Sequence, residues 1–179
     1  MNIIERIKQE IEKQNRIACC FAGPRSQKLP WGFNEQDKRC LNVKDMTREE
    51  IVKAIKEGYS VFMSGMAIGF DMICAEIVLE LKKQYPKIKL YCIIPCKGQE
   101  KVWSKELQIR YHNILRKADK VNVLYNTYSR ECMLNRNKYM VNNSAKLIAL
   151  YGGSGGGTKF TIDYAREQGL DVVILTPWL

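Results

Sequence analysis

The feature that most constrains the fold is a run of glycines placed directly between a strand pattern and a helix pattern. The short apolar run at 147–151 predicts a buried strand, and residues 159–165 have helical spacing. The seven positions between them hold Gly152, Gly153, Ser154, Gly155, Gly156, Gly157 and Thr158. A strand that turns through glycines into a helix offers free N–H groups and a positive dipole end, which predicts an anion site, most often for phosphate. A flexible linker is the alternative interpretation, disfavoured because both patterns adjoin the glycines.

The rest of the chain alternates strand and helix patterns. Further strands are predicted at 16–22, 59–63, 89–94, 120–124 and 171–175, and further helices at 1–15, 47–57, 70–84, 100–117 and 136–143. Continuous apolar strands alternating with helices predict an α/β fold with a doubly wound, mainly parallel sheet and helices on both faces. The first helix is amphipathic, with Ile3, Ile4, Ile7 and Ile11 on one stripe. We expect it to pack on a single domain formed by residues 16–179 rather than to dock a partner subunit.

Composition narrows the function classes only slightly. The 179 residues carry a net charge of +10, from 29 basic and 19 acidic side chains, and 46% are hydrophobic. A basic surface suits nucleic acid or phosphorylated small molecules, but the lysines are dispersed and form no block. No apolar run reaches the roughly 18 residues that a membrane span needs, so no membrane partner is expected.

The cysteines favour a reducing compartment. Their number, seven, is odd, and Cys19, Cys20, Cys74 and Cys92 lie in apolar runs. Because residues 1–16 are charged and carry no signal-peptide core, we expect reduced thiols in the cytoplasm. Cys92 and Cys96 have no second pair nearby, and the sequence has one histidine, so we expect neither a metal site nor a cofactor.

Ligands of parallel sheets bind beyond the carboxyl ends of the strands, where the strand order reverses. Segments 23–26, 64–71, 95–99 and 152–158 follow strands and therefore share that edge. From them, from the helix at 136–143 and from the polar loop at 27–43 we expect the ligand contacts, namely Gly23, Arg25, Trp31, Ser64, Gly65, Gly69, Asp71, Pro95, Gln99, Arg136, Gly153, Ser154, Gly155, Gly156, Gly157 and Thr158.

Some of these residues have two open interpretations. Gly65 and Gly69 allow close backbone approach to a phosphate, and Ser64 either donates to it or caps the turn. Asp71 accepts from ribose hydroxyls or complements a helix dipole. Arg25 and Arg136 bind anions or are solvated surface residues. Trp31, or the nearby Phe33, is a candidate to stack on a base.

The sequence contains neither a P-loop nor the G-x-G-x-x-G motif of dinucleotide-binding enzymes. Gly152 and Gly157 have P-loop spacing, but Thr158 precedes Lys159, the reverse of the required order. That inversion moves the cation away from the phosphate, so we do not infer an ATPase. A dinucleotide oxidoreductase is poorly supported, since no strand is followed by G-x-G-x-x-G and a later acidic residue.

Several blocks of the chain, at 19–23, 27–32, 64–71, 94–100 and 136–141 together with the glycine run, resemble the YpsA-like family of the SLOG (Smf/DprA–LOG) superfamily. The resemblance covers residues 16–175. It implies a Rossmann-like fold, a nucleotide or nucleotide-derived ligand and, by analogy with LOG-like proteins, a homo-oligomer, most simply a dimer.

Two positions depart from the family pattern. The family usually has histidine after the first glycine, where this chain has Pro24. LOG enzymes, which release a base from a nucleoside monophosphate, carry a catalytic glutamate where this chain has Thr161. A hydroxyl does not act as a carboxylate at neutral pH, so the LOG reaction is not favoured unless Asp71 or Glu76 stands in.

The sequence therefore favours a binding protein, a sensor or sequestering agent for a nucleotide-derived small molecule such as an ADP-ribose-type or cyclic nucleotide. Two alternatives stay open. One is a nucleotide N-glycosidase, or phosphoribohydrolase, of LOG type. The other is single-stranded DNA binding in the manner of DprA, motivated by the net charge of +10.

Overall fold

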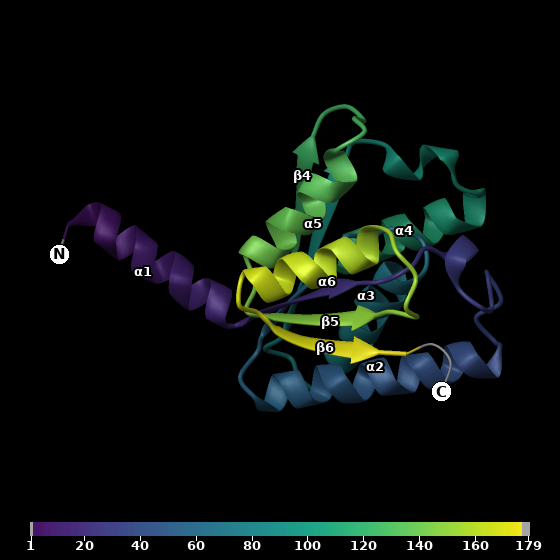
Figure 1. Cartoon of the computed structure of the whole chain (residues 1–179), viewed down its shortest axis with the longest axis horizontal. Helices are drawn as coiled ribbons and strands as arrows, with labels where there is room; N and C mark the ends of the chain where they lie inside the picture. The colour runs from purple at the N-terminus through teal and green to yellow at the C-terminus, as the bar shows by residue number, and fades with distance from the viewer. Residues whose placement is uncertain (1, 177–179) are drawn as a thin grey trace.

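A computed structural model describes residues 2–176 and shows a six-stranded sheet in which every pair of neighbouring strands is parallel (Figure 1). The strand order is β4-β3-β2-β1-β5-β6. The strands are β1 (Ala18–Ala22), β2 (Val61–Ser64), β3 (Lys89–Cys96), β4 (Lys120–Tyr125), β5 (Lys146–Leu150) and β6 (Asp171–Leu175). All six lie where the apolar runs predict them, and the α/β, Rossmann-like fold is confirmed.

The central strands are apolar apart from Ser64 at the end of β2 and Lys146 at the start of β5, because both faces of the sheet are covered. All residues of β1, β2 and β5 are buried. On one face, Cys19 and Phe21 join the core formed with α2 (Lys38–Lys56), α3 (Phe70–Leu81) and α4 (Lys105–Lys117). On the other face, Ala18, Cys20 and Ala22 pack beneath α5 (Cys132–Asn142) and α6 (Gly157–Glu167), which lie in front of the sheet in Figure 1.

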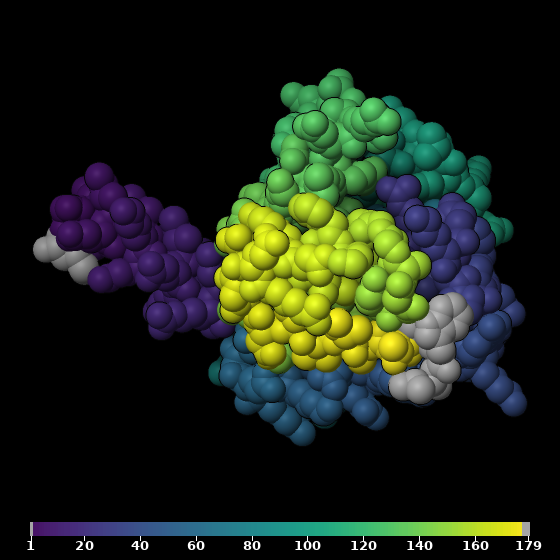
Figure 2. Space-filling view, in the orientation of Figure 1, coloured from purple at the N-terminus to yellow at the C-terminus, as the bar shows by residue number. Residues whose placement is uncertain are grey.

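The first helix differs from the expectation that it packs on the domain. Helix α1 (Ile3–Arg16) contains no buried residue and projects from the sheet as a separate arm (Figure 2). Asn2 and Glu5 form a capping box at its start. The exposed fractions along the stripe fall from 75% at Ile3 to 49% at Ile11, so this apolar face is uncovered in the single chain.

The predicted helix at 47–57 rests on Thr47 and Glu50, which are three residues apart as in a capping box. Helix α2 begins nine residues before Thr47. Its N-cap is Asp37, whose carboxylate accepts from the Arg39 N–H at 2.8 Å. Thr47 is buried inside the helix, and its hydroxyl donates to the Val43 carbonyl at 2.7 Å. The capping-box pattern was therefore misleading, because an internal threonine can satisfy its hydroxyl on the preceding turn.

Three other boundaries also shift. The predicted helix at 100–117 is divided into a short 3-10 turn, η2 (Gln99–Val102), and α4, which Ser104 caps. Strand β3 continues through Pro95 to Cys96, so the proline does not end it. Helix α5 begins four residues before Arg136, which places that arginine one turn inside the helix. Among the described residues, no helix is both long and apolar enough to cross a membrane.

The turn after β2 lies against the turn after β1. Gly69 is the N-cap of α3 and has φ +98°, a left-handed conformation that favours glycine. A Cβ at this position would lie 2.7 Å from both the Pro24 carbonyl oxygen and the Ser26 nitrogen. The Phe70 N–H donates to the same Pro24 carbonyl at 3.2 Å. Gly69 therefore holds two carboxyl-edge segments in contact.

We predict that Gly69→Ala lowers the free energy of unfolding by at least about 2 kcal/mol, from the left-handed backbone together with the overlap. Gly153→Ala is the matched control, since Gly153 has φ +91° but no atom within 4 Å of its added Cβ; we expect it to lose about 1 kcal/mol. Urea unfolding of both variants measures the difference. Equal losses would show that the close approach at Gly69 contributes nothing.

Candidate functional site

The strand order reverses beside β1. The chain passes from β1 to β2 through α2 on one face, and from β4 to β5 through α5 on the other face, so β1 lies between β2 and β5. The carboxyl ends of β1 and β5 then open a crevice, which is where doubly wound sheets bind ligands. A hollow of about 280 Å³ lies there, which we call the switch-point hollow.

The switch-point hollow brings together six of the predicted site residues. Its wall contains Gly23, Arg25, Asp71, Arg136, Gly157 and Thr158. It also contains Lys28, Asn137 and Thr161, which sequence reasoning did not propose as contacts. The segments after β1, β2 and β5 therefore meet at one place, as the parallel sheet predicts.

Arg136 is the buried cation of this wall. Its side chain reaches from α5 across to the turn after β2, where Nη1 donates to the Gly65 carbonyl, and Nε donates to the Asn137 amide oxygen at 2.8 Å. The residue is only 4% exposed. Burial lowers the pKa of the Arg136 guanidinium, the Asp71 carboxylate opposes that shift, and the charge of Arg25 adds to it. Arg25 and Lys28, on the loop after β1, complete a cationic side of the hollow.

Asp71 is the only acid among the described residues that line the hollow. It lies in the first turn of α3 and is 6% exposed, and its Oδ2 accepts from the Ala67 N–H at 3.2 Å. Burial raises the pKa of the Asp71 carboxyl, while Arg136, the Ala67 N–H and Arg25 partly offset that rise. A buried carboxyl beside two arginines can accept hydrogen bonds from ligand hydroxyls.

Thr161 is the residue that the family resemblance aligns with the glutamate of LOG enzymes, and its hydroxyl is engaged. It donates to the Gly157 carbonyl at 2.8 Å and accepts from the Asn137 side-chain amide at 3.1 Å. This chain of hydrogen bonds ties α5 to the first turn of α6. It positions Asn137 and the helix start, and it supplies no carboxylate.

The glycine loop borders the hollow and is open. Residues 152–157 are all exposed, and an added Cβ would meet no atom within 4 Å at Gly153, Gly155 or Gly157. Helix α6 has Gly156 as its N-cap and therefore no side-chain cap. Its first N–H groups are not occupied by a capping side chain, and they lie beside the Lys28 ammonium, whose Nζ is 3.9 Å from the position of an added Gly156 Cβ. Of this loop and the helix start, Gly157 and Thr158 line the hollow, whereas the predicted contacts Gly153, Ser154, Gly155 and Gly156 are not part of its lining.

The turn after β2 is used for internal packing, contrary to the expectation that its glycines face a phosphate. Gly65 lies under the Arg136 guanidinium, which leaves no space for a Cβ, and Gly69 lies against residues 24–26. The Ser64 hydroxyl donates to the Asp71 carbonyl at 2.8 Å and accepts from the Met66 N–H at 3.2 Å. Ser64 therefore caps the turn, and Ala67 is the part of it that reaches the hollow.

The remaining predicted contacts lie elsewhere. Trp31 is 6% exposed and belongs to the core, so it is not placed to stack on a base, and Phe33 is exposed but lines a different hollow. Pro95 is buried inside β3. Gln99 lines a second hollow of about 370 Å³, which shares Arg25, Ala67 and Met133 with the switch-point hollow. The two hollows are therefore neighbours along the same sheet edge.

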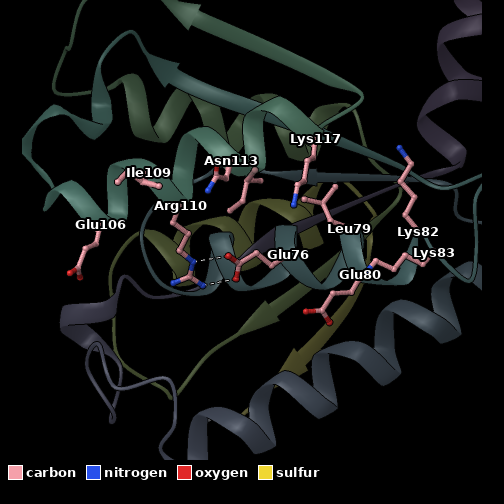
Figure 3. A pocket seen from close by; sticks show the side chains of 11 residues that line it. Glu76, Leu79, Glu80, Lys82, Lys83, Glu106, Ile109, Arg110, Asn113 and Lys117 are labelled. Carbon is pink, nitrogen blue, oxygen red and sulfur yellow. Dashed lines mark hydrogen bonds and ion pairs between the residues drawn. The ribbon is translucent and has the colours of Figure 1, made fainter.

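A larger groove, of about 930 Å³, lies between α3 and α4, away from the strand ends (Figure 3). Two of the four basic side chains in its lining, Arg110 and Lys82, are paired with acids. Arg110 donates to Glu76 at 2.7 and 2.8 Å and to Glu35 at 2.6 Å, and Lys82 pairs with Asp119 at 2.6 Å. With Arg110 and Lys82 already paired and three glutamates in its lining, this groove offers less to an anion than the smaller switch-point hollow.

Comparison with known proteins shows the family of this chain. The sequence model of the YpsA family, described as the YspA SLOG family, matches residues 19–172. The chain belongs to this family. It is 36% identical over 140 residues to a UPF0398 protein of Brevibacillus brevis, covering 76% of this chain and 74% of that protein. It is 34% identical over 140 residues to the uncharacterized SPbeta prophage-derived protein YoqJ of Bacillus subtilis, covering 71% and 82%.

Solved structures confirm the fold. DNA processing protein A of Helicobacter pylori, described for its single-stranded DNA binding mode, aligns with a TM-score of 0.61 and 16% identity over 92% of this chain and 67% of that one. The corresponding protein of Streptococcus pneumoniae gives a TM-score of 0.58 and 15% identity over 92% of this chain and 51% of that one. At such identities the likeness concerns the Rossmann-like fold alone.

Proposed function

We propose that this protein binds a nucleotide-derived small molecule, such as an ADP-ribose-type or cyclic nucleotide, at the switch-point hollow. The observation that carries the proposal is the convergence of Arg25, Lys28 and Arg136 on the start of α6, which has no side-chain cap. Cations and free helix N–H groups together favour a phosphate.

The remaining lining suits the sugar of such a ligand. Asp71 and the Asn137 side chain lie on the same wall as the cations, and both carry groups that bond hydroxyls. A phosphate at Gly157 and Thr158 then leaves the ribose near Asp71. The second hollow extends the space available beyond Arg25, so a ligand larger than a monophosphate has room. Sensing or sequestration, the role that we propose, needs binding of this kind and no turnover.

A nucleotide N-glycosidase of LOG type is the first alternative. Asp71 is the carboxyl that the hollow offers for it, and its raised pKa is of the kind found in acid catalysts. Incubation with nucleoside monophosphates and with ADP-ribose, followed by analysis for free base, distinguishes turnover from binding. Ligand that stays intact after long incubation would remove this alternative.

Single-stranded DNA binding is the second alternative. The structural likeness to the Helicobacter pylori protein and the net charge of +10 favour it. Such binding to oligonucleotides would fall steeply as salt rises, because phosphate contacts release counterions. Absence of oligonucleotide retention at low salt would end this alternative.

We predict that the phosphate contact depends on the cations of the loop after β1. In calorimetry with AMP, ADP-ribose and cyclic nucleotides, Lys28→Ala and Arg25→Ala should each weaken binding about tenfold, the effect of losing one charge-assisted hydrogen bond. Lys117→Ala is the matched control, because Lys117 lines the α3–α4 groove; its affinity should equal that of the unsubstituted protein. If none of the nucleotides binds, or if all three variants bind them with the affinity of the unsubstituted protein, the site is wrongly placed.

We also propose a homo-oligomer, most simply a dimer, in the cytoplasm. All seven cysteines are free and buried thiols, which suits a reducing compartment. Helix α1 is 14 residues long and buries nothing in the single chain. Isolated helices of this length are marginal in water, so a second copy that covers the isoleucine stripe would stabilise it.

Removal of residues 1–15 tests this arrangement. We predict that the full chain sediments as a dimer and the truncated chain as a monomer, because the truncation deletes the exposed isoleucines while leaving the two buried cores intact. Circular dichroism of the truncated chain provides the folding control. A full chain that sediments as a monomer at micromolar concentration would contradict the proposal.

A further inference from the structure

A side chain in the wall of the second hollow carries a polar atom that the fold leaves unsatisfied. Gln99, at the start of η2, is 9% exposed and lines this hollow. Its side-chain oxygen Oε1 is buried and has no hydrogen-bond partner in the described part of the chain. An orphaned buried acceptor costs about 1–3 kcal/mol, and such a group in a native structure calls for an explanation.

The Gln99 amide nitrogen is already committed. Nε2 donates to the Met66 carbonyl at 3.3 Å and to the Tyr111 hydroxyl at 3.4 Å. Both distances lie beyond the usual range for N–H···O bonds. The two bonds therefore orient the amide but are weak. Because Nε2 is engaged, the group that remains for a ligand is the acceptor oxygen.

We propose that the second hollow is a nucleobase subsite in which Gln99 Oε1 accepts from the exocyclic amino group of a base such as adenine. This inference rests on the proposed function, in which the phosphate and sugar occupy the switch-point hollow. It assigns the base to the neighbouring space and identifies the group that reads it.

The surroundings of Gln99 fit a flat base. Trp103 and Tyr128 lie in the wall of the second hollow and supply aromatic surface, while Ile68 and Val102 supply apolar surface. Arg25, Ala67 and Met133 line both hollows, so a single ligand can pass from one to the other beside the Arg25 guanidinium. The volume of about 370 Å³ lies within the range of small-molecule sites.

The chemistry of the acceptor makes the subsite selective. A base that presents an amino group satisfies Oε1 and removes the cost of the orphaned acceptor. A base with the same shape but no amino group leaves Oε1 unpaired, and sites built around a hydrogen-bonding group reject ligands that lack its partner. Discrimination should therefore depend on one functional group and not on the size of the base.

The test compares AMP with purine riboside 5′-monophosphate, which differs from AMP only in lacking the exocyclic amino group. Calorimetry on the full chain should show AMP binding about tenfold more tightly. In Gln99→Met, which keeps the length of the side chain but removes the acceptor, the ratio should fall to about one. Ile109→Ala is the control, because Ile109 lines the α3–α4 groove instead and is 53% exposed; its ratio should remain that of the unsubstituted protein.

The outcomes separate this inference from the proposed function. Equal binding of the two nucleotides to the unsubstituted protein would overturn the base subsite while leaving the phosphate site in place. Failure of both to bind would overturn the two together. If Gln99→Met does not fold, as judged by its thermal unfolding, the ratio measured on the unsubstituted protein still decides the question.

Discussion

The structure depends on a close approach of three backbone segments at the carboxyl edge of the sheet. Gly69 touches the backbone after β1, the Phe70 ring covers Gly23, and the Arg136 guanidinium lies on Gly65. Each contact needs the absence of a Cβ. Together they draw the ends of β1 and β2 and the middle of α5 into one rigid wall, and that wall is what sets Asp71 and Arg136 beside the crevice.

The glycines at this edge of the sheet therefore have two different structural roles. Gly23, Gly65 and Gly69, which follow β1 and β2, are packed against neighbouring atoms. This packing brings Asp71 and Arg136 to the same wall of the hollow. After β5, an added Cβ at Gly153, Gly155 or Gly157 would meet no atom within 4 Å, and Gly157 lines the hollow with bare backbone. The ligand site that we propose is therefore asymmetric: one side offers helix N–H groups and Lys28, and the other offers a buried arginine and carboxyl held by the packed turns.

Periodicity and apolar runs were sufficient to predict the six strands, their parallel pairing and the edge at which the segments after β1, β2 and β5 meet. They could not reveal what each glycine contacts, because Gly65 and Gly153 look alike in a sequence and differ only in what packs against them. Trp31 was misplaced for a related reason, since an aromatic residue in a polar loop can still reach the core. Thr47 was wrongly predicted to cap a helix, because in a sequence a threonine inside a helix cannot be distinguished from one at a helix start. Asn137 adjoins Arg136 and lies within a block that carries the family resemblance, a signal that could have marked it as a contact.

We propose above all that the first N–H groups of α6 and the cations beside them bind a phosphate. Amide chemical shifts recorded during a titration with AMP test it most directly. We predict saturable shifts at Gly157 and Thr158 and at the Asn137 side-chain amide, with Asn113 in the α3–α4 groove unchanged. Shifts confined to that groove, or none at the start of α6 at millimolar AMP, would contradict it.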